Sequence, residues 1–319
     1  MKMLDRKMVL ALACVLAAGA VHGADSPPDW AYPVNPPGFK PKPDDGAPRH
    51  VPGSNASFTL TQLRDRFFSP VWHPGEHPAQ PEVVARGRKP EVFACGFCHR
   101  ADGPGGPENS NIAGLPAAYL VQQMADYKSG ARKTSVPGRN IDLMISLAKA
   151  ATDAEIEAAA AYFSALKTRA VVRVVESDSV PRTYVTGWHF AAMGKGEQEA
   201  LGQRIIEMPE VFEHFESRDT HARFIAYVPP GSIEKGRALA TTGGGKTVQC
   251  ASCHGPELKG AGAIPGLAGR SPTYLVRQLY DFKHGARQGA ESPQMKPTVE
   301  NLAIEDMIAL AAYVASLAP

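Results

Sequence analysis

The sequence has few cysteines and little net charge. Five of its 319 residues are cysteine, and 34 basic against 32 acidic residues leave a net charge of +2. Four cysteines lie in two short motifs, and the fifth, Cys14, lies in a segment that we expect to be removed, so no thiol remains for a disulfide. Removing residues 1–23 takes the charge of the mature chain close to zero. This balance argues against nucleic acid as a partner.

Long hydrophobic runs are also scarce. The one apolar stretch, Met8 to Val21, follows a basic start and precedes small residues. This order is typical of a secretory signal peptide over residues 1–23, cleaved after Gly23 or Ala24. The stretch is shorter than the roughly 20 residues that a membrane-spanning helix needs, although an uncleaved anchor is the alternative. We therefore expect export to a bacterial periplasm and no integral membrane span in the mature chain.

Two Cys-x-x-Cys-His motifs are present, at Cys95 to His99 and at Cys250 to His254. One helical turn places both thiols against the two vinyl groups of a porphyrin, and the adjacent imidazole reaches the iron on one face. A redox dithiol or half a zinc site shares the Cys-x-x-Cys spacing, but a histidine that follows in both copies favours haem. We predict two covalently bound haem c groups. The predicted attachment residues are Cys95, Cys98, Cys250 and Cys253, and the predicted axial ligands are His99 and His254.

The motifs belong to a module that occurs twice. In both halves 24 residues separate the first motif cysteine from a tyrosine, Tyr119 or Tyr274, and the same register continues to Arg132 and Arg287. After these arginines the second copy is four residues shorter, and a constant offset of 151 residues then holds. The chain therefore uses one module in two copies, with a length difference that we expect in a loop.

Met144 and Met295 align under this offset and are the candidate sixth ligands. A sixth ligand must come from chain well downstream of the attachment motif, folded back over the opposite face of the porphyrin. Both methionines precede the final helix of their module, which suits a ligand loop. Thioether sulfur favours ferrous iron and raises the reduction potential. Packing in the core is the alternative role of a methionine, and we assign it to Met124, which aligns with Leu279.

Hydrophobic periodicity predicts helical modules. Apolar residues recur at helical spacing over 116–129 and 271–284, and a capping box at Thr152 to Glu155 opens another helix. Between the modules, residues 169–230 carry short β-branched and aromatic runs that predict a small antiparallel sheet. The proline-rich residues 25–56 are expected to form an extended arm without a core of its own.

These residues together resemble the two-domain, dihaem class I cytochromes c of bacterial periplasms. The resemblance rests on both haem motifs, on the Pro265 to Gly269 run and on the Gly-Ala-Arg ends of two equivalent helices. It implies a mainly α-helical protein in which a small β-rich connector joins two tandem cytochrome c domains behind a Pro-rich N-terminal arm. The expected divisions are a signal peptide at 1–23, the extension at 24–80, domain 1 at 81–168, the connector at 169–230 and domain 2 at 231–319.

One position departs from the family pattern. The resemblance implies that the carbonyl of Pro265 orients the axial histidine of the second module, and Ser110 occupies the aligned position in the first. A backbone carbonyl at Ser110 would serve as well, but we expect the orientation of His99 to differ from that of His254.

Electron transfer between periplasmic redox proteins is the function that the resemblance implies, with no catalytic residue of its own. One alternative is an electron-transfer subunit of a periplasmic dehydrogenase. Another is a dihaem enzyme of the peroxidase or thiosulfate dehydrogenase type. A peroxidase needs an open iron site and the second type often uses a cysteine ligand, whereas here each module offers a methionine and no free cysteine remains.

Histidines outside the motifs are alternative ligands. His73 and His77 suggest a metal, but no ligand cluster accompanies them in the sequence, so we interpret them as part of a surface turn. His189, His214 and His221 lie in the connector, and we interpret them as polar surface or hydrogen-bonded residues.

We predict that the mature protein retains two haems per chain after denaturation, because thioether bonds survive unfolding. Haem staining of a denaturing gel and the pyridine haemochrome assay measure this directly. A stoichiometry of one, or haem that acid acetone extracts, would contradict the prediction.

Overall fold

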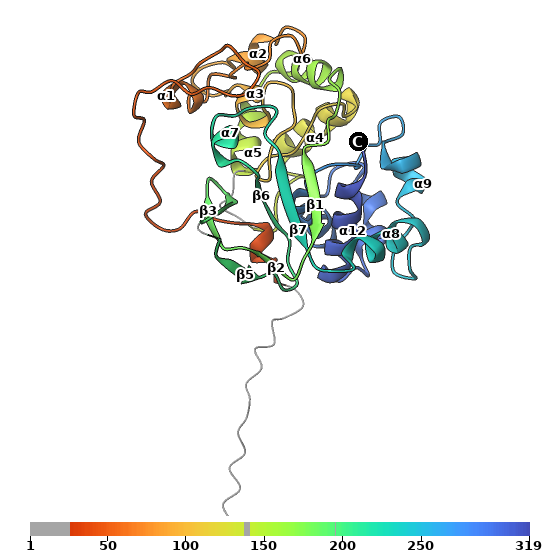
Figure 1. The fold of residues 1–319 in the computed structure, drawn as a ribbon. Coiled ribbons are helices and arrows are strands. Elements are labelled where there is room, and N and C mark those ends of the chain that lie inside the picture. Colours follow the sequence, from red (N-terminus) through yellow and green to blue (C-terminus); the bar gives the residue numbers. More distant parts are fainter. Residues whose placement is uncertain (1–25, 137–140, 195) are drawn as a thin grey trace, which may run out of the picture.

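The computed structural model describes residues 26–136, 141–194 and 196–319 (Figure 1). The predicted signal peptide and its cleavage sites at Gly23 and Ala24 lie outside these residues, as does part of the longer loop of the first module. Within the described ranges, no helix is both long and apolar enough to cross a membrane.

The first module is a set of helices around one apolar core. Thr152 caps α6 as predicted: its side chain accepts a hydrogen bond from the backbone N–H of Glu155, whose own side chain accepts one from the backbone of Thr152. Buried side chains that include Val84 and Phe163 fill the space between the helices. The helices of this module are α2 (Glu82–Ala85), α3 (Cys95–His99), α4 (Ala117–Ser129), α5 (Ile141–Ala150) and α6 (Asp153–Ser164).

The second module repeats this arrangement with longer flanking helices. Its two long helices α8 and α12 cross closely at Gly236, where an added Cβ would lie 1.9 Å from the carbonyl oxygen of Ala309. The predicted helix over 271–284 is confirmed as α10. The elements are α8 (Ser232–Thr242), α9 (Ala251–His254), η2 (Pro256–Leu258), α10 (Pro272–Lys283), η3 (Ser292–Met295), α11 (Lys296–Val299) and α12 (Ile304–Ser316).

The connector contains the predicted strands, but its main sheet is mixed rather than antiparallel. In the order β1-β7-β6, the outer strand β1 is parallel to β7, and β6 is antiparallel to it. Both parallel strands run from the first module towards α8, because the chain between them returns to the first module before β7 begins (Figure 1). The connector elements are β1 (Val172–Glu176), β2 (Ser179–Pro181), β3 (Thr183–Thr186), β4 (His189–Ala192), β5 (Gln198–Ala200), β6 (Ile206–Pro209), α7 (Phe212–Glu216) and β7 (Phe224–Val228).

The N-terminal extension contacts both modules. It begins with η1 (Asp29–Ala31), where the hydroxyl of Tyr32 donates to Oδ1 of Asp281 at 3.2 Å, in the second module. It then runs as a loop to α1 (Leu60–Leu63) beside the first module (Figure 1). At the end of the proline-rich stretch 25–56, Val51 packs with Leu60, Leu63 and Trp72 in a small cluster. These three partners lie outside the stretch, in the residues that follow it.

We predict that Gly236→Ala destabilises the second module, because its methyl group must displace the backbone of α12. The expected loss in the free energy of unfolding is about 2 kcal/mol even though alanine favours helices. Denaturant unfolding followed by circular dichroism measures it. Gly75→Ala, where nothing lies within 4 Å of the added Cβ, should change stability by less than about 0.5 kcal/mol, and equal effects of both variants would contradict the prediction.

Candidate haem-binding sites

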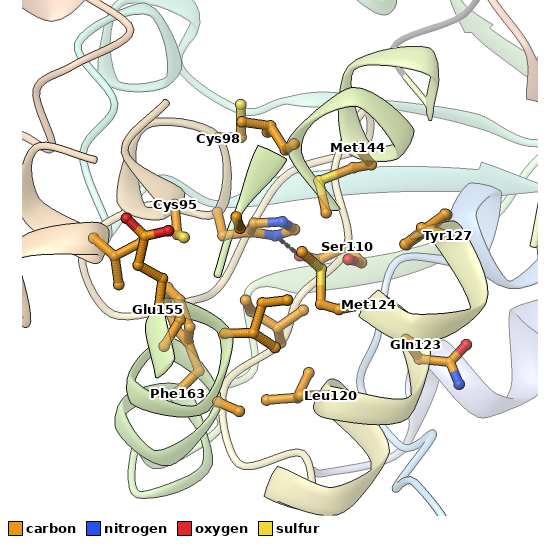
Figure 2. Close-up of a pocket in the computed structure, with 18 of the residues that line it drawn as sticks. Cys95, Cys98, Ser110, Leu120, Gln123, Met124, Tyr127, Met144, Glu155 and Phe163 are labelled. Atoms are coloured by element: carbon orange, nitrogen blue, oxygen red, sulfur yellow. Dashed lines mark hydrogen bonds between the residues drawn. The ribbon is translucent and has the colours of Figure 1, made fainter. Parts of the chain in front are cut away.

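The first candidate site is a mostly apolar cavity that contains the predicted ligands of the first motif. About 990 Å³ of space outside protein atoms, including the part open to solvent, lies among α3, α4, α5 and α6. Figure 2 shows the thiols of Cys95 and Cys98 around this cavity, together with Met124 and Met144. Apolar side chains such as Leu120 and Phe163 also line it. The predicted haem residues that line it are Cys95, Cys98, His99 and Met144.

The second candidate site lies in the other module and contains the same kinds of predicted ligand, two cysteines, a histidine and a methionine. About 1990 Å³ of such space lies between α10, the η3 segment and the second motif. Leu115, Tyr119, Gln123 and Tyr274 line both cavities, so the two sites adjoin across the module interface. The predicted haem residues that line the second cavity are Cys250, Cys253, His254 and Met295.

A backbone carbonyl holds each axial histidine in the same way. Nδ1 of His99 lies 2.9 Å from the carbonyl oxygen of Ser110, and Nδ1 of His254 lies 2.8 Å from that of Pro265. The expected difference in orientation through this contact is therefore wrong, because only the carbonyl takes part and serine supplies it as well as proline. Burial lowers the pKa of His99 and of His254. Each imidazole is thus neutral at pH 7, with Nδ1–H donating and a lone pair on Nε2 for a metal.

The thiols do not fit a redox dithiol. Burial raises the pKa of Cys95 to about 12 and that of Cys250 to about 11. A dithiol that exchanges disulfides needs a lowered pKa to supply thiolate. Protonated thiols beside a large apolar cavity fit the thioether chemistry that the motifs predict.

The candidate methionines reach their cavities from different elements. Met144 lies in the first turns of α5 and Met295 at the end of η3. The expectation of a ligand loop in both modules is therefore wrong for Met144. Met124 of α4 lines the first cavity too, whereas its counterpart in the second is Leu279.

Arg132 and Arg287 form a crossed network between the two cavities. Oε1 of Gln123 accepts from Nη1 of Arg132 and Nη2 of Arg287, both at 2.8 Å. Oε1 of Gln278 accepts from the same two guanidinium groups at 2.9 and 3.0 Å. Arg132 and Arg287 are only 5% and 8% exposed, so both charges are buried at the boundary of the cavities rather than solvated at the ends of their helices.

This network has unsatisfied polar atoms that fit a bound haem. Nε of Arg132 and Nε of Arg287 are buried without a hydrogen-bond partner among the described residues. Neither guanidinium forms an ion pair within the described ranges, although burying an unpaired charge is costly. A group that carries carboxylates in each cavity would supply the missing acceptors and the opposite charge, as the propionates of haem do.

A further tyrosine lies within this charged interface. The hydroxyl of Tyr274 accepts from Nη2 of Arg132 at 3.1 Å. Burial would raise the pKa of Tyr274, but Arg132 and Arg287 together lower it. Tyr274 therefore lies in the positive field of Arg132 and Arg287 at the boundary of the two cavities.

Comparison with known proteins decides the family. The family model for cytochrome c matches residues 84–167 and 233–318, one match over each module. The chain belongs to the cytochrome c family. With two motif-bearing modules, this cytochrome carries two covalently bound haem c groups.

Individual relatives of this cytochrome span both modules. The thiosulfate dehydrogenase electron acceptor of Thiomonas intermedia is 30% identical over 203 residues, which are 63% of this chain and 67% of its own length. Cytochrome c4 of Azotobacter vinelandii is 24% identical over 258 residues, 76% of this chain and 91% of its own length. A solved structure of thiosulfate dehydrogenase from Marichromatium purpuratum has 28% identity and a TM-score of 0.48, with a match that covers 73% of this chain and 38% of that chain.

The glutamines of the network are residues that sequence reasoning missed. Gln123 and Gln278 align under the same 155-residue offset that pairs Arg132 with Arg287, so the repeat itself contained the signal. Nothing in the sequence showed that all four side chains meet. By contrast, none of the other histidines considered as ligands is among the described residues that line the two cavities.

We predict that Met144→Ala and Met295→Ala each open one iron of the cytochrome. Each variant should lose half of the Met–iron absorption in the near-red and bind one carbon monoxide per chain in the ferrous state, because one axial position becomes vacant.

Two variants serve as controls for this assignment. Met193→Ala alters a half-exposed methionine and should leave both irons closed. Met124→Leu introduces the residue of the second module and should also keep the Met–iron band. Loss of the band in Met124→Leu, with retention in Met144→Ala, would move the ligand assignment to Met124.

Proposed function

We propose that this cytochrome transfers electrons between redox proteins of the bacterial periplasm and makes or breaks no substrate bond. The observation that carries the proposal is that each cavity holds a neutral histidine and a methionine, the pair His99 and Met144 in one module and His254 and Met295 in the other. Iron held by both residues has no position left for a substrate.

The protein residues have separate roles in this function. Haem, when bound, supplies the ferric and ferrous states between which an electron is exchanged. The thiols of Cys95, Cys98, Cys250 and Cys253 would hold it covalently. The Ser110 and Pro265 carbonyls fix the two imidazoles. The apolar lining of both cavities excludes water and limits the reorganisation that a change of charge requires.

The shared boundary of the cavities supports electron exchange between the two modules. Tyr119 and Tyr274 line both cavities, so two haems bound there would adjoin across a few side chains. The positive field of Arg132 and Arg287 would stabilise the extra electron on either side. We infer that the cytochrome accepts an electron at one module and passes it on from the other.

We also propose roles for the remaining divisions of the chain. A signal peptide at 1–23 would direct export. The extension at 24–80 and the connector at 169–230 would hold domain 1 at 81–168 and domain 2 at 231–319 in a fixed relation. Buried Glu207 of β6 supports this role, because its carboxylate accepts hydrogen bonds from the hydroxyls of Ser271 and Thr273 at the start of α10.

A second candidate function is that of a dedicated electron acceptor for one periplasmic dehydrogenase. The relative from Thiomonas intermedia, whose name describes it as the electron acceptor of thiosulfate dehydrogenase, favours this candidate. The chemistry within the cytochrome would be the same, and only the donor would be fixed.

The test is a redox titration of the purified cytochrome together with a survey of its reactions. We expect two reversible one-electron steps, slow carbon monoxide binding, and no turnover of peroxide or of thiosulfate with ferricyanide. Addition of a thiosulfate dehydrogenase and thiosulfate should reduce both haems if the second candidate holds. Turnover of peroxide or of thiosulfate by the cytochrome alone would replace the carrier proposal with an enzymatic one.

A further inference from the structure

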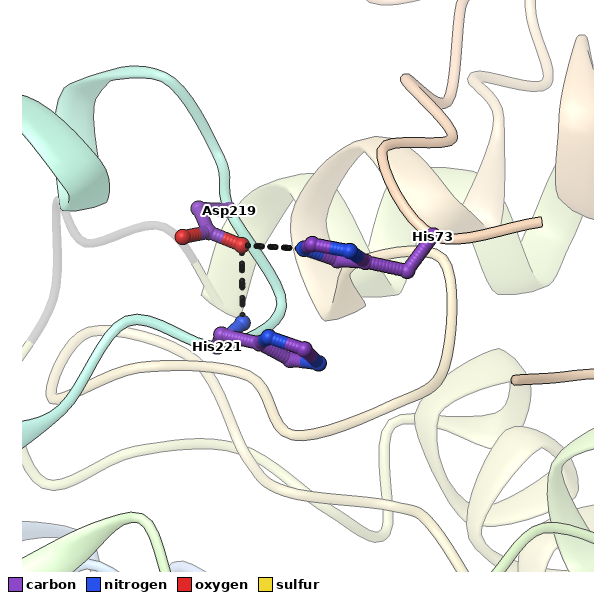
Figure 3. Close-up of side chains that lie close together, drawn as sticks. All are labelled: His73, Asp219 and His221. Carbon is purple, nitrogen blue, oxygen red and sulfur yellow. Dashed lines mark hydrogen bonds and ion pairs between the residues drawn. The ribbon is translucent and has the colours of Figure 1, made fainter. Parts of the chain in front are cut away.

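Four side chains of complementary chemistry meet beside the first module, outside the set of residues that line its cavity. His73 comes from the N-terminal extension, and Asp219 and His221 come from the loop between α7 and β7 (Figure 3). One donor atom from each of these three residues lies within 4.8 Å of the others. Glu76 lies beside them, with Oε2 2.7 Å from Nε2 of His221. None of the four residues takes part in the haem sites.

From this geometry we propose that His73, Asp219 and His221 form a binding site for one divalent transition-metal ion of the zinc class. Two imidazoles and one carboxylate are a donor set that such ions prefer. Nε2 of His73 lies 3.1 Å from Oδ1 of Asp219. Two donors that share a zinc ion at about 2.0–2.1 Å have a similar separation.

Glu76 fixes which nitrogen of His221 is available. Its carboxylate accepts the hydrogen of Nε2, which leaves the lone pair on Nδ1 for the metal, as in the carboxylate–histidine–metal arrangement. Glu76 also pairs with Arg169 at 2.7 Å, so its charge is already balanced. Asp219 is then the carboxylate that would offset part of the charge of the ion.

The two imidazole rings already lie in contact at this site. They stack with centroids 3.8 Å apart and an interplanar angle of 8° (Figure 3). The lone pair of an imidazole nitrogen lies in the plane of its ring, so the two parallel rings must tilt towards each other before both nitrogens bind one ion. Binding would also bring the three donor atoms, which lie within 4.8 Å of one another, to the separation of about 3.3 Å that a tetrahedral zinc site has. The half-exposed ring of His221 has room for this movement.

Burial and access suit a metal that enters from solvent. His73 is 8% exposed and Asp219 is 2% exposed, so two donors are held firmly within the protein. The side chain of His221 is 39% exposed. This leaves an entry path and room for water to complete the coordination.

The position of the site indicates what the metal would do. The metal would join the N-terminal extension to the connector loop, segments that lie 146 residues apart in sequence. The same loop contacts the first haem-attachment helix: Arg218 stacks on the ring of Phe97 at 3.6 Å and donates to its carbonyl oxygen at 2.6 Å. A bound ion would therefore hold the N-terminal extension and the connector loop together next to α3, and so stabilise the first module.

The test uses the mature, untagged protein with both haems, stripped with a chelator and then titrated with zinc. After gel filtration we expect one zinc for every two irons by elemental analysis. X-ray absorption at the zinc edge should show scattering from two imidazoles. Zinc should raise the midpoint of thermal unfolding by about 5 °C.

His221→Gln and Asp219→Asn should weaken zinc binding by at least about tenfold and abolish the thermal shift. His50→Gln removes an exposed histidine elsewhere in the extension and should bind zinc as the wild type does. Two haems per chain and an unchanged haem spectrum show that a variant is folded. The proposal is overturned if the wild type retains no zinc, or if folded His221→Gln binds it with wild-type affinity.

Discussion

The crossed pairing of Arg132 and Arg287 with Gln123 and Gln278 is the interaction on which the arrangement of this cytochrome depends. Each guanidinium bonds to a glutamine of its own module and to one of the other, so neither network is complete within a single module. The backbone reinforces the pairing, because Lys133 and Gln288 donate to the carbonyls of Ala286 and Ala131. The two modules thus meet around an approximate twofold relation.

Burying the charges of Arg132 and Arg287 together costs free energy, and this cost connects the pairing with the haem sites. Two buried positive charges at one interface repel each other, and four amide and guanidinium bonds do not remove that repulsion. The unpaired Nε atoms of Arg132 and Arg287 lie beside the two cavities. Groups of negative charge in both cavities would offset this repulsion, so haem binding and module docking would support one another.

The two modules are similar in sequence but are supported by different surroundings. In the second module the long helices α8 and α12 pack against each other at Gly236, and β1 adds to the same core. In the first module the counterpart of α8 is the single turn α2. The extension and the loop around Asp219 cover the first module instead. The backbone N–H of Ser69 donates to the carbonyl oxygen of Ala85 at 2.9 Å, and Nη1 of Arg218 donates to that of Phe97 at 2.6 Å. Residues outside the repeat thus compensate for the shorter helix.

The sequence alone determined the features that depend on short spacing and on the repeat. The thioether motifs, the helices α4, α6 and α10, and the aligned methionines all follow from residues within one module, because local periodicity and a fixed offset carry that information. The tertiary structure decided which distant side chains meet. The members of each pair, His73 with His221 and Arg132 with Arg287, lie too far apart in the sequence for a local pattern to show that they meet. Strand direction in the connector was decided in the same way, because the route of the chain between β1 and β7 depends on where the two modules dock, and no local pattern encodes that.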